Sequence, residues 1–100
     1  MSMDTAVINI AEKQAALCRV LGSARRLIIL WLISQGELSV NDIAERVGSS
    51  VQNISQHLSL LKRSGFVIAR RDGQTIYYQL ADEEYLRHCP ALQHAPESLK

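Results

Sequence analysis

The chain has 100 residues, of which 47% are apolar and 21% charged, a balance typical of a globular domain and not of a disordered or fibrous protein. The formal net charge is only +1, so a nucleic-acid surface would have to gather its positive charge locally. The longest apolar run, Leu27 to Ile33, is far shorter than the roughly 20 residues that span a bilayer, and no export signal is visible. We therefore expect a single cytoplasmic domain, residues 1–100, with no membrane partner and with reduced cysteines.

Apolar residues at helical spacing predict a first amphipathic helix over about residues 6–21. They are Val7, Ile10, Leu17, Cys18 and Leu21. Ser23 then offers a capping hydroxyl to a second helix, "ARRLIILWLI", which is expected to end at Gly36 in the C′ position. Because this helix contains the longest apolar run, it should be buried on most sides.

Two further caps predict a pair of short helices joined by a tight turn. Ser39 is expected to cap a helix over residues 40–47. Ser49, with Gln52 in the capping-box position, is expected to cap the next helix, which ends before Gly65.

The hydrophobic period changes after this helix, which predicts a β-hairpin. The runs "FVIARR" and "QTIYYQL" are rich in β-branched and aromatic residues and flank Asp72-Gly73, a strong signal for a type I′ turn. A two-residue loop at Asp72-Gly73 would place Ala69 opposite Ile76 and Val67 opposite Tyr78. The hairpin would then have one apolar face.

The last helix is expected to be short. Asp82 can cap it, Pro90 prevents it from continuing, and residues 91–100 are expected to fray. The predicted fold is mostly α with a β-hairpin wing (α+β). Two short helices, a tight turn and a following hairpin are the elements of a winged helix-turn-helix.

The second helix of this motif predicts contact with DNA. Its apolar stripe, Val51, Ile54, Leu58 and Leu61, should pack on the core and leave uncharged hydrogen-bonding side chains outside. Amides and hydroxyls suit base edges in the major groove, while nearby cations, among them Lys62, suit phosphates. A polar helix face is often merely solvated, but Ser and Asn are mediocre helix formers, so their accumulation favours a binding role. The residues assigned to DNA contact are Ser49, Ser50, Gln52, Asn53, Ser55, Gln56, His57, Arg63, Arg70 and Arg71.

These segments resemble the ArsR/SmtB family of bacterial winged-helix repressors. The resembling stretches are "LGSARRLIILWLI", "GELSVNDIAERVGSSVQNISQHLSLLKRSGFV" and "RRDGQTIYYQL". The specific pattern "SxxxxSxHLxxLxxxGLV" is met by Ser50, Ser55, His57, Leu58, Leu61, Gly65 and Val67, with Phe66 in place of Leu. The resemblance implies a homodimer that binds a double-stranded DNA operator and leaves it when an inducer binds. It also implies an interface formed by the first and last helices, and a DNA-facing role for Ser50, Ser55 and His57.

The chain departs from the family at its known sensor positions. Where arsenic- and lead-sensing members have "ELCVCDL", this chain has "ELSVNDI", with Ser39 and Asn41 in place of the cysteines. The last helix, broken by Pro90, is too short for the zinc and nickel ligands of other members. Trp31 stands where persulfide-sensing members carry a cysteine in the second helix. None of these family sites is expected, and no cofactor is.

Two cysteines remain as candidate sensor residues. Cys18 on the apolar stripe can be a small hydrophobe, whereas Cys89 follows Arg87 and His88, which suit a reactive thiol. We hypothesise a redox or sulfur-species switch based on a Cys18–Cys89 bond. The competing hypothesis is a soft-metal site formed by Cys18, Cys89 and His88, with His94 as a further ligand. The inducer itself stays unknown.

Two other functional classes are less well supported. Some winged helices only dock proteins, but docking faces favour aromatic residues and Met at their centre, and this helix has Gln, Asn and Ser. Catalysis is not expected, because no nucleophile–base pair, phosphate loop or paired carboxylates occur at useful spacing. Ser55 and His57 lie two residues apart on one helix and point in different directions. The sequence predicts a regulator, not an enzyme.

Overall fold

The structure, a computed structural model, describes residues 4–82 and 84–99. Four helices come before the wing: α1 (Thr5–Leu21), α2 (Ala24–Ile33), α3 (Val40–Val47) and α4 (Val51–Arg63). The strands are β1 (Leu38–Ser39), β2 (Val67–Asp72) and β3 (Thr75–Leu80). The chain ends with α5 (Glu84–Arg87), α6 (Pro90–Gln93) and the 3-10 turn η1 (Glu97–Leu99). This order confirms the predicted mostly helical fold with a β-hairpin wing.

The helix-turn-helix is packed around the apolar stripe of α4. Ile54, Leu58 and Leu61 are fully buried and join side chains of α1, α2 and α3 in one core. Phe66, which replaces the family's Leu, is also buried there. Val51 was predicted to share the stripe but is 44% exposed, because it lies in the first turn of α4, beyond the packed part of the helix.

Hydroxyl caps begin three of the helices. The Oγ atoms of Ser23 and Ser39 accept from the third backbone N–H of α2 and α3, at 3.3 and 3.2 Å, as predicted. α2 itself ends at Ile33 with Ser34 as its C-cap, so its C′ residue is Gln35, one residue before the expected Gly36. The predicted cap of α4 was wrong by one residue. Ser50, not Ser49, accepts from the backbone N–H of Asn53, at 3.1 Å.

The wing has the predicted strands in a different register. Val67 pairs with Leu80 and Ala69 with Tyr78, so the pairing is shifted by two residues and the loop is Gly73-Gln74. A type I′ turn at Asp72-Gly73 needs two residues with positive φ, but among the described residues only glycines have positive φ, and Gly73 is one of them at +65°. A two-residue shift keeps each side chain on its predicted face, because the side-chain period of a strand is two.

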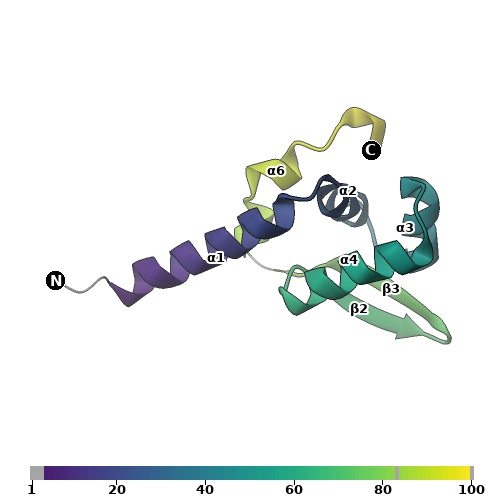
Figure 1. The fold of residues 1–100 in the computed structure, drawn as a ribbon, viewed down its shortest axis with the longest axis horizontal. Coiled ribbons are helices and arrows are strands. Elements are labelled where there is room, and N and C mark those ends of the chain that lie inside the picture. The colour runs from purple at the N-terminus through teal and green to yellow at the C-terminus, as the bar shows by residue number, and fades with distance from the viewer. Residues whose placement is uncertain (1–3, 83, 100) are drawn as a thin grey trace.

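A short third strand extends the hairpin into a three-stranded antiparallel sheet. β1 pairs with β3, placing Leu38 opposite Tyr78, and the strand order is β1-β3-β2. This pairing ties the start of α3 to the wing. Figure 1 shows the hairpin running beside α4, with which β2 is in contact.

Helix α1 extends away from the rest of the chain (Figure 1). Leu17 and Val20, near its end, are buried, whereas Val7, Ile8 and Ile10 are 41–61% exposed. Cys18, expected on the buried stripe, is exposed. Only the last turns of α1 reach the core. The helical spacing of apolar residues therefore predicted an apolar face whose first half is exposed in the single chain.

The C-terminal segment is more ordered than predicted. Pro90 does not end the helical region but begins α6, because proline is compatible with the first helical position. Trp31 Nε1 donates to the carbonyl oxygen of Ala91 at 2.8 Å, and Leu92 is buried, so residues 91–99 do not fray as a whole. The residue directly before α5 lies outside the described part of the chain, so the cap by Asp82 stays a prediction; Asp82 forms an ion pair with Arg87.

Candidate nucleic-acid interface

The outer face of α4 carries the predicted polar side chains. Gln52 and Gln56 are exposed, and Asn53, Ser55 and His57 are half-buried at its margins. Because Ile54, Leu58 and Leu61 anchor the opposite face, the amides and hydroxyls project from a helix whose orientation is fixed. Neither Glu nor Lys interrupts this face between residues 49 and 59. Such a surface can offer donors and acceptors to base edges.

A hydrogen-bond network joins the first turn of α4 to α2. Asn53 Oδ1 accepts from Arg25 Nη1 at 3.3 Å and from Ser49 Oγ at 3.0 Å. Sequence reasoning missed Arg25, because the contact spans 28 positions and no local pattern links α2 to α4. The sequence did give the position of Arg25 within its helix, because the predicted cap at Ser23 places Arg25 in the first turn of α2. It did not show that this turn lies beside α4. The exposed guanidinium of Arg25 therefore adds positive charge beside the polar face.

His57 lies at the margin of α4 that is closest to α2. Partial burial lowers the pKa of His57 below its ordinary value, and the positive charges of Arg26 and then Arg25 lower it further. Arg26 also donates to the carbonyl oxygens of Val20 and Arg19, at 3.1 and 3.3 Å, and so clamps α2 to the end of α1. Near neutral pH His57 is uncharged, and it offers hydrogen bonds, not a cation.

The predicted basic residues divide into two groups. Lys62 and Arg63 in the last turn of α4 and Arg71 in β2 are exposed. Arg70, in contrast, is held by Glu37 through two hydrogen bonds, one of them from Nε to Oε2 at 3.1 Å. It also lies over the ring of Tyr77, 5.0 Å from the centroid.

The ion pair between Arg70 and Glu37 changes the pKa of both groups. The hydrogen bond from Arg70 lowers the pKa of Glu37, and the same hydrogen bond raises the pKa of Arg70. Arg70 is therefore less available to phosphates in the free chain than sequence reasoning assumed.

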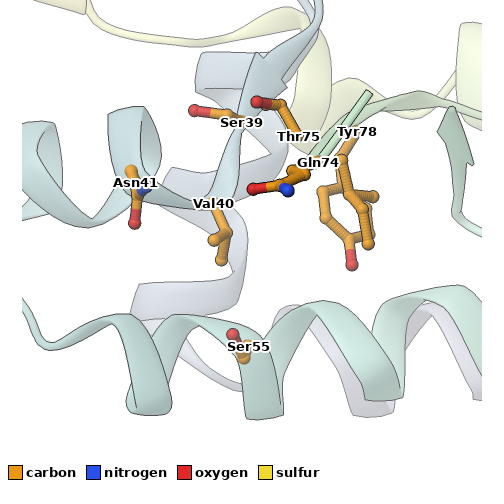
Figure 2. Close-up of a pocket in the computed structure, with 8 residues that line it drawn as sticks. Ser39, Val40, Asn41, Ser55, Gln74, Thr75 and Tyr78 are labelled. Carbon is orange, nitrogen blue, oxygen red and sulfur yellow. The ribbon is translucent and has the colours of Figure 1, made fainter. Parts of the chain in front are cut away.

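A cavity of about 220 Å³ lies between α3, α4 and the wing. Figure 2 shows Ser55 on α4 facing Gln74 and Tyr78 of the wing across this space. Ser39 and Asn41, which replace the cysteines of the thiolate-sensing pattern, also line it. The side chains that line the cavity are uncharged, so no ion pair links the wing to α4 across it.

The candidate sensor residues lie in different environments. Cys18 is exposed on α1, Cys89 is buried between α5 and α6, and both are free thiols. Within residues 4–82 and 84–99, no three His, Cys, Asp or Glu side chains gather as metal ligands would. In the same residues no helix has the length and apolarity needed to cross a membrane.

A wing, a capped helix-turn-helix and an outward amide face define the chain as a winged-helix DNA-binding protein. A family model described as "Bacterial regulatory protein, arsR family" matches residues 23–69. Over 74 residues the chain is 38% identical to the transcriptional activator HlyU of Vibrio cholerae, covering 74% of this chain and 68% of HlyU. The chain belongs to the arsR family of transcriptional regulators, which are not enzymes.

Other relatives agree with this assignment. The chain is 45% identical over 65 residues to the transcriptional regulator KmtR of Mycobacterium tuberculosis, which is 65% of this chain but only half of KmtR. The structure of reduced HlyU from Vibrio cholerae superposes with a TM-score of 0.74 at 31% identity, covering 86% of this chain and 99% of HlyU. The homodimeric winged helix-turn-helix domain of Mb0332 from Mycobacterium bovis has a TM-score of 0.73 at 34% identity, covering 87% and 81%.

Proposed function

We propose that this regulator is a homodimeric repressor in the bacterial cytoplasm, which binds a DNA operator and leaves it when an inducer binds. The observation that carries the proposal is the outer face of α4, where exposed Gln52 and Gln56 stand over a fully buried seam. A helix anchored in this way can enter the major groove while Ile54, Leu58 and Leu61 stay buried. A docking face for proteins would be richer in aromatic residues and Met.

The proposed contacts follow from exposure and chemistry. Gln52, Gln56, Asn53 and Ser55 read base edges, while Ser49, Ser50, His57, Arg63, Arg70 and Arg71 contact the backbone or hold the reading residues in place. Ser50 lies at the positive end of α4, which suits a phosphate, and Lys62 adds charge at the other end. Phosphate contacts of this kind make binding strongly dependent on salt concentration.

The proposed homodimer is supported by α1. Val7, Ile8 and Ile10 form an exposed apolar group on a helix that extends beyond the body of the chain. The solved domain of Mb0332 is described as homodimeric. A dimer presents two copies of α4 and so can bind two operator half-sites.

Gln56→Ala tests the base-reading role. If Gln56 makes a bidentate contact, the variant should lose roughly 1–3 kcal/mol of discrimination between an operator and a random duplex. Fluorescence anisotropy with DNA from upstream of the protein's own gene, against a random duplex of equal length, measures this difference. Gln35→Ala, an exposed glutamine after α2, is the matched control and should leave the difference unchanged. Equal losses on both duplexes would rule out base reading by Gln56.

We further propose that the inducer acts on thiols, through Cys18 and Cys89. Cys18 is exposed to an oxidant, whereas Cys89 is packed with Leu86 and Leu92 in the core. A Cys18–Cys89 disulfide therefore requires Cys89 to leave the core, which would disturb the α5–α6 segment. With hydrogen peroxide the two thiols lose two protons and two electrons, and the peroxide is reduced to two waters. One solved relative is a reduced form of HlyU.

Mass spectrometry after peroxide treatment tests the thiol proposal. We expect a disulfide-linked peptide pair that contains Cys18 and Cys89, together with loss of operator binding. Cys18→Ser should abolish both effects. If both cysteines can still be alkylated after the treatment, thiol sensing is excluded. The metal alternative with His88 has no comparable support, because no set of three ligands gathers in the described part of the chain.

A further inference from the structure

The side-chain amide of Asn53 is fixed in one orientation. Its Oδ1 atom accepts from Arg25 Nη1 at 3.3 Å and from Ser49 Oγ at 3.0 Å. Arginine has only donors, so the amide atom that faces Arg25 must be the oxygen. An amide oxygen has two lone pairs, and these two bonds occupy both of them.

The other end of the amide is open. Among the described residues no acceptor is bonded to Asn53 Nδ2, and no buried side-chain nitrogen or oxygen lacks a partner. Nδ2 is therefore in contact with solvent. The backbone N–H of Asn53 is bonded to the capping hydroxyl of Ser50, so the residue is fixed at both its backbone and its side chain.

We infer that Asn53 meets DNA as a hydrogen-bond donor alone and selects guanine or thymine, not adenine, at one position of each operator half-site. Arg25 and Ser49 act as positioning residues that hold the amide oxygen away from the base. The inference rests on the proposed operator binding and names the base that one residue selects.

Base-edge chemistry explains the selection. The usual Asn–adenine pair needs the amide oxygen to accept from N6 while the nitrogen donates to N7. With the oxygen occupied, Asn53 cannot form this pair. Guanine offers two adjacent acceptors, O6 and N7, and thymine offers O4, whereas cytosine presents the N4 donor. Adenine has one acceptor, N7, but the N6 donor beside it opposes the second N–H of an amide that can only donate. Gln52 and Gln56, whose amides are bonded to no other described residue, keep both functions and can still pair with adenine.

Selection from a pool of random duplexes, followed by sequencing, tests this inference with the full chain. The wild type should enrich guanine or thymine at one position per half-site. Asn53→Ala should lower the preference at that position alone, by about tenfold, since a good base contact corresponds to roughly 1–3 kcal/mol. Asn53→Asp replaces the NH₂ donor by a second oxygen acceptor, and its preference should move to cytosine, whose N4 can donate to a carboxylate.

The double variant R25A/S49A tests the positioning residues. It frees the amide oxygen of Asn53, so the preference at this position should move to adenine. Arg63→Ala, which removes an exposed arginine that makes no contact with Asn53, should weaken binding to all duplexes and leave every base preference unchanged. Circular dichroism confirms that each variant is folded.

The outcomes separate this inference from the proposed function. If the wild type enriches no sequence, the operator-binding proposal itself fails. If it enriches an operator but Asn53→Ala changes no position, or the Asn53-dependent base is adenine or cytosine, the donor role of Asn53 is wrong. If R25A/S49A keeps guanine or thymine at that position, Arg25 and Ser49 do not position the amide.

Discussion

Glu37 holds Arg70, a cation of the wing that we propose contacts DNA. Arg70 has the strand position expected of a phosphate contact, yet in the free chain it donates two hydrogen bonds to Glu37. Both side chains are partly exposed, 48% for Arg70 and 32% for Glu37, so the ion pair is weakened by solvent and can exchange for a phosphate. When Arg70 leaves Glu37 for a phosphate, the Glu37 carboxylate loses its partner close to the DNA backbone. The repulsion between these two negative groups opposes binding. The pair therefore limits the electrostatic affinity of the wing.

Glu37→Gln should increase affinity for random duplex DNA. The change removes a competing carboxylate and keeps the side-chain shape, so Arg70 can contact a phosphate and release one more counterion. The slope of log K against log salt should become steeper by roughly 0.9, the value for one phosphate on duplex DNA. Fluorescence anisotropy at several salt concentrations measures it. Glu45→Gln on α3 has the same change in charge but frees no arginine, and should leave the slope unchanged. If Glu37→Gln has the same slope as the wild type, Glu37 does not compete with phosphate for Arg70.

At the scale of elements, the cap of α4 determines which side chains remain available to DNA. Because Ser50 is the cap, Ser49 is free to bond the amide of Asn53. Ser50→Ala should lower the free energy of unfolding by about 1 kcal/mol, whereas Ser50→Gly should cost only a few tenths. Urea denaturation measures both changes. Ser49→Ala should cost less than Ser50→Ala, since its bond joins two side chains and supports no backbone N–H. If Ser49→Ala lowered the free energy of unfolding more than Ser50→Ala, Ser49 would be the N-cap of α4.

The elements themselves were largely predictable, because periodicity and capping are local. The sequence patterns predicted α2, α3 and the strands of the wing correctly. The patterns predicted wrongly where two local arrangements fit the sequence equally well. Two adjacent serines can cap α4, and a hairpin around Asp72-Gly73 keeps its faces if the register moves by two residues. The backbone decides between the two registers, because Asp72 lacks the positive φ that a type I′ turn at Asp72-Gly73 would need.

The candidate site was predictable where it depends on one helix and not where it depends on two. The outward direction of Gln52 and Gln56 follows from the buried seam of α4 alone. The contacts of Arg25 with Asn53 and of Arg70 with Glu37 span 28 and 33 positions. They arise only when α2 packs beside α4 and the residue before β1 lies beside the wing, so no sequence window contains them.

At the scale of the whole molecule, a single chain presents one α4 and one uncovered apolar helix. The chain is elongated, 52 × 31 × 21 Å, because α1 extends beyond the core. In the described part of the chain the first half of α1 is exposed, and its apolar Val7, Ile8 and Ile10 would gain burial from a partner. Dimerisation through α1 would also fix the distance between two copies of α4, which half-sites one helical turn apart require. Assembly and operator recognition should therefore fail together.

Ile10→Glu should separate the dimer and leave the fold of each chain intact. Ile10 is 61% exposed in the single chain, so the charge is tolerated there, but at an apolar interface it would be desolvated without a partner. We expect the dimer dissociation constant to rise about tenfold or more. Sedimentation equilibrium should then show a mass that approaches 11.2 kDa, not twice this value. Operator affinity should fall with the dimer, while the α-helical circular dichroism signal stays close to that of the wild type. Asn9→Glu adds the same charge one residue away, about 100° around α1 from Ile10 and opposite the mean direction of Val7, Ile8 and Ile10, and should keep the dimer. A dimer that persists in Ile10→Glu would place the interface elsewhere.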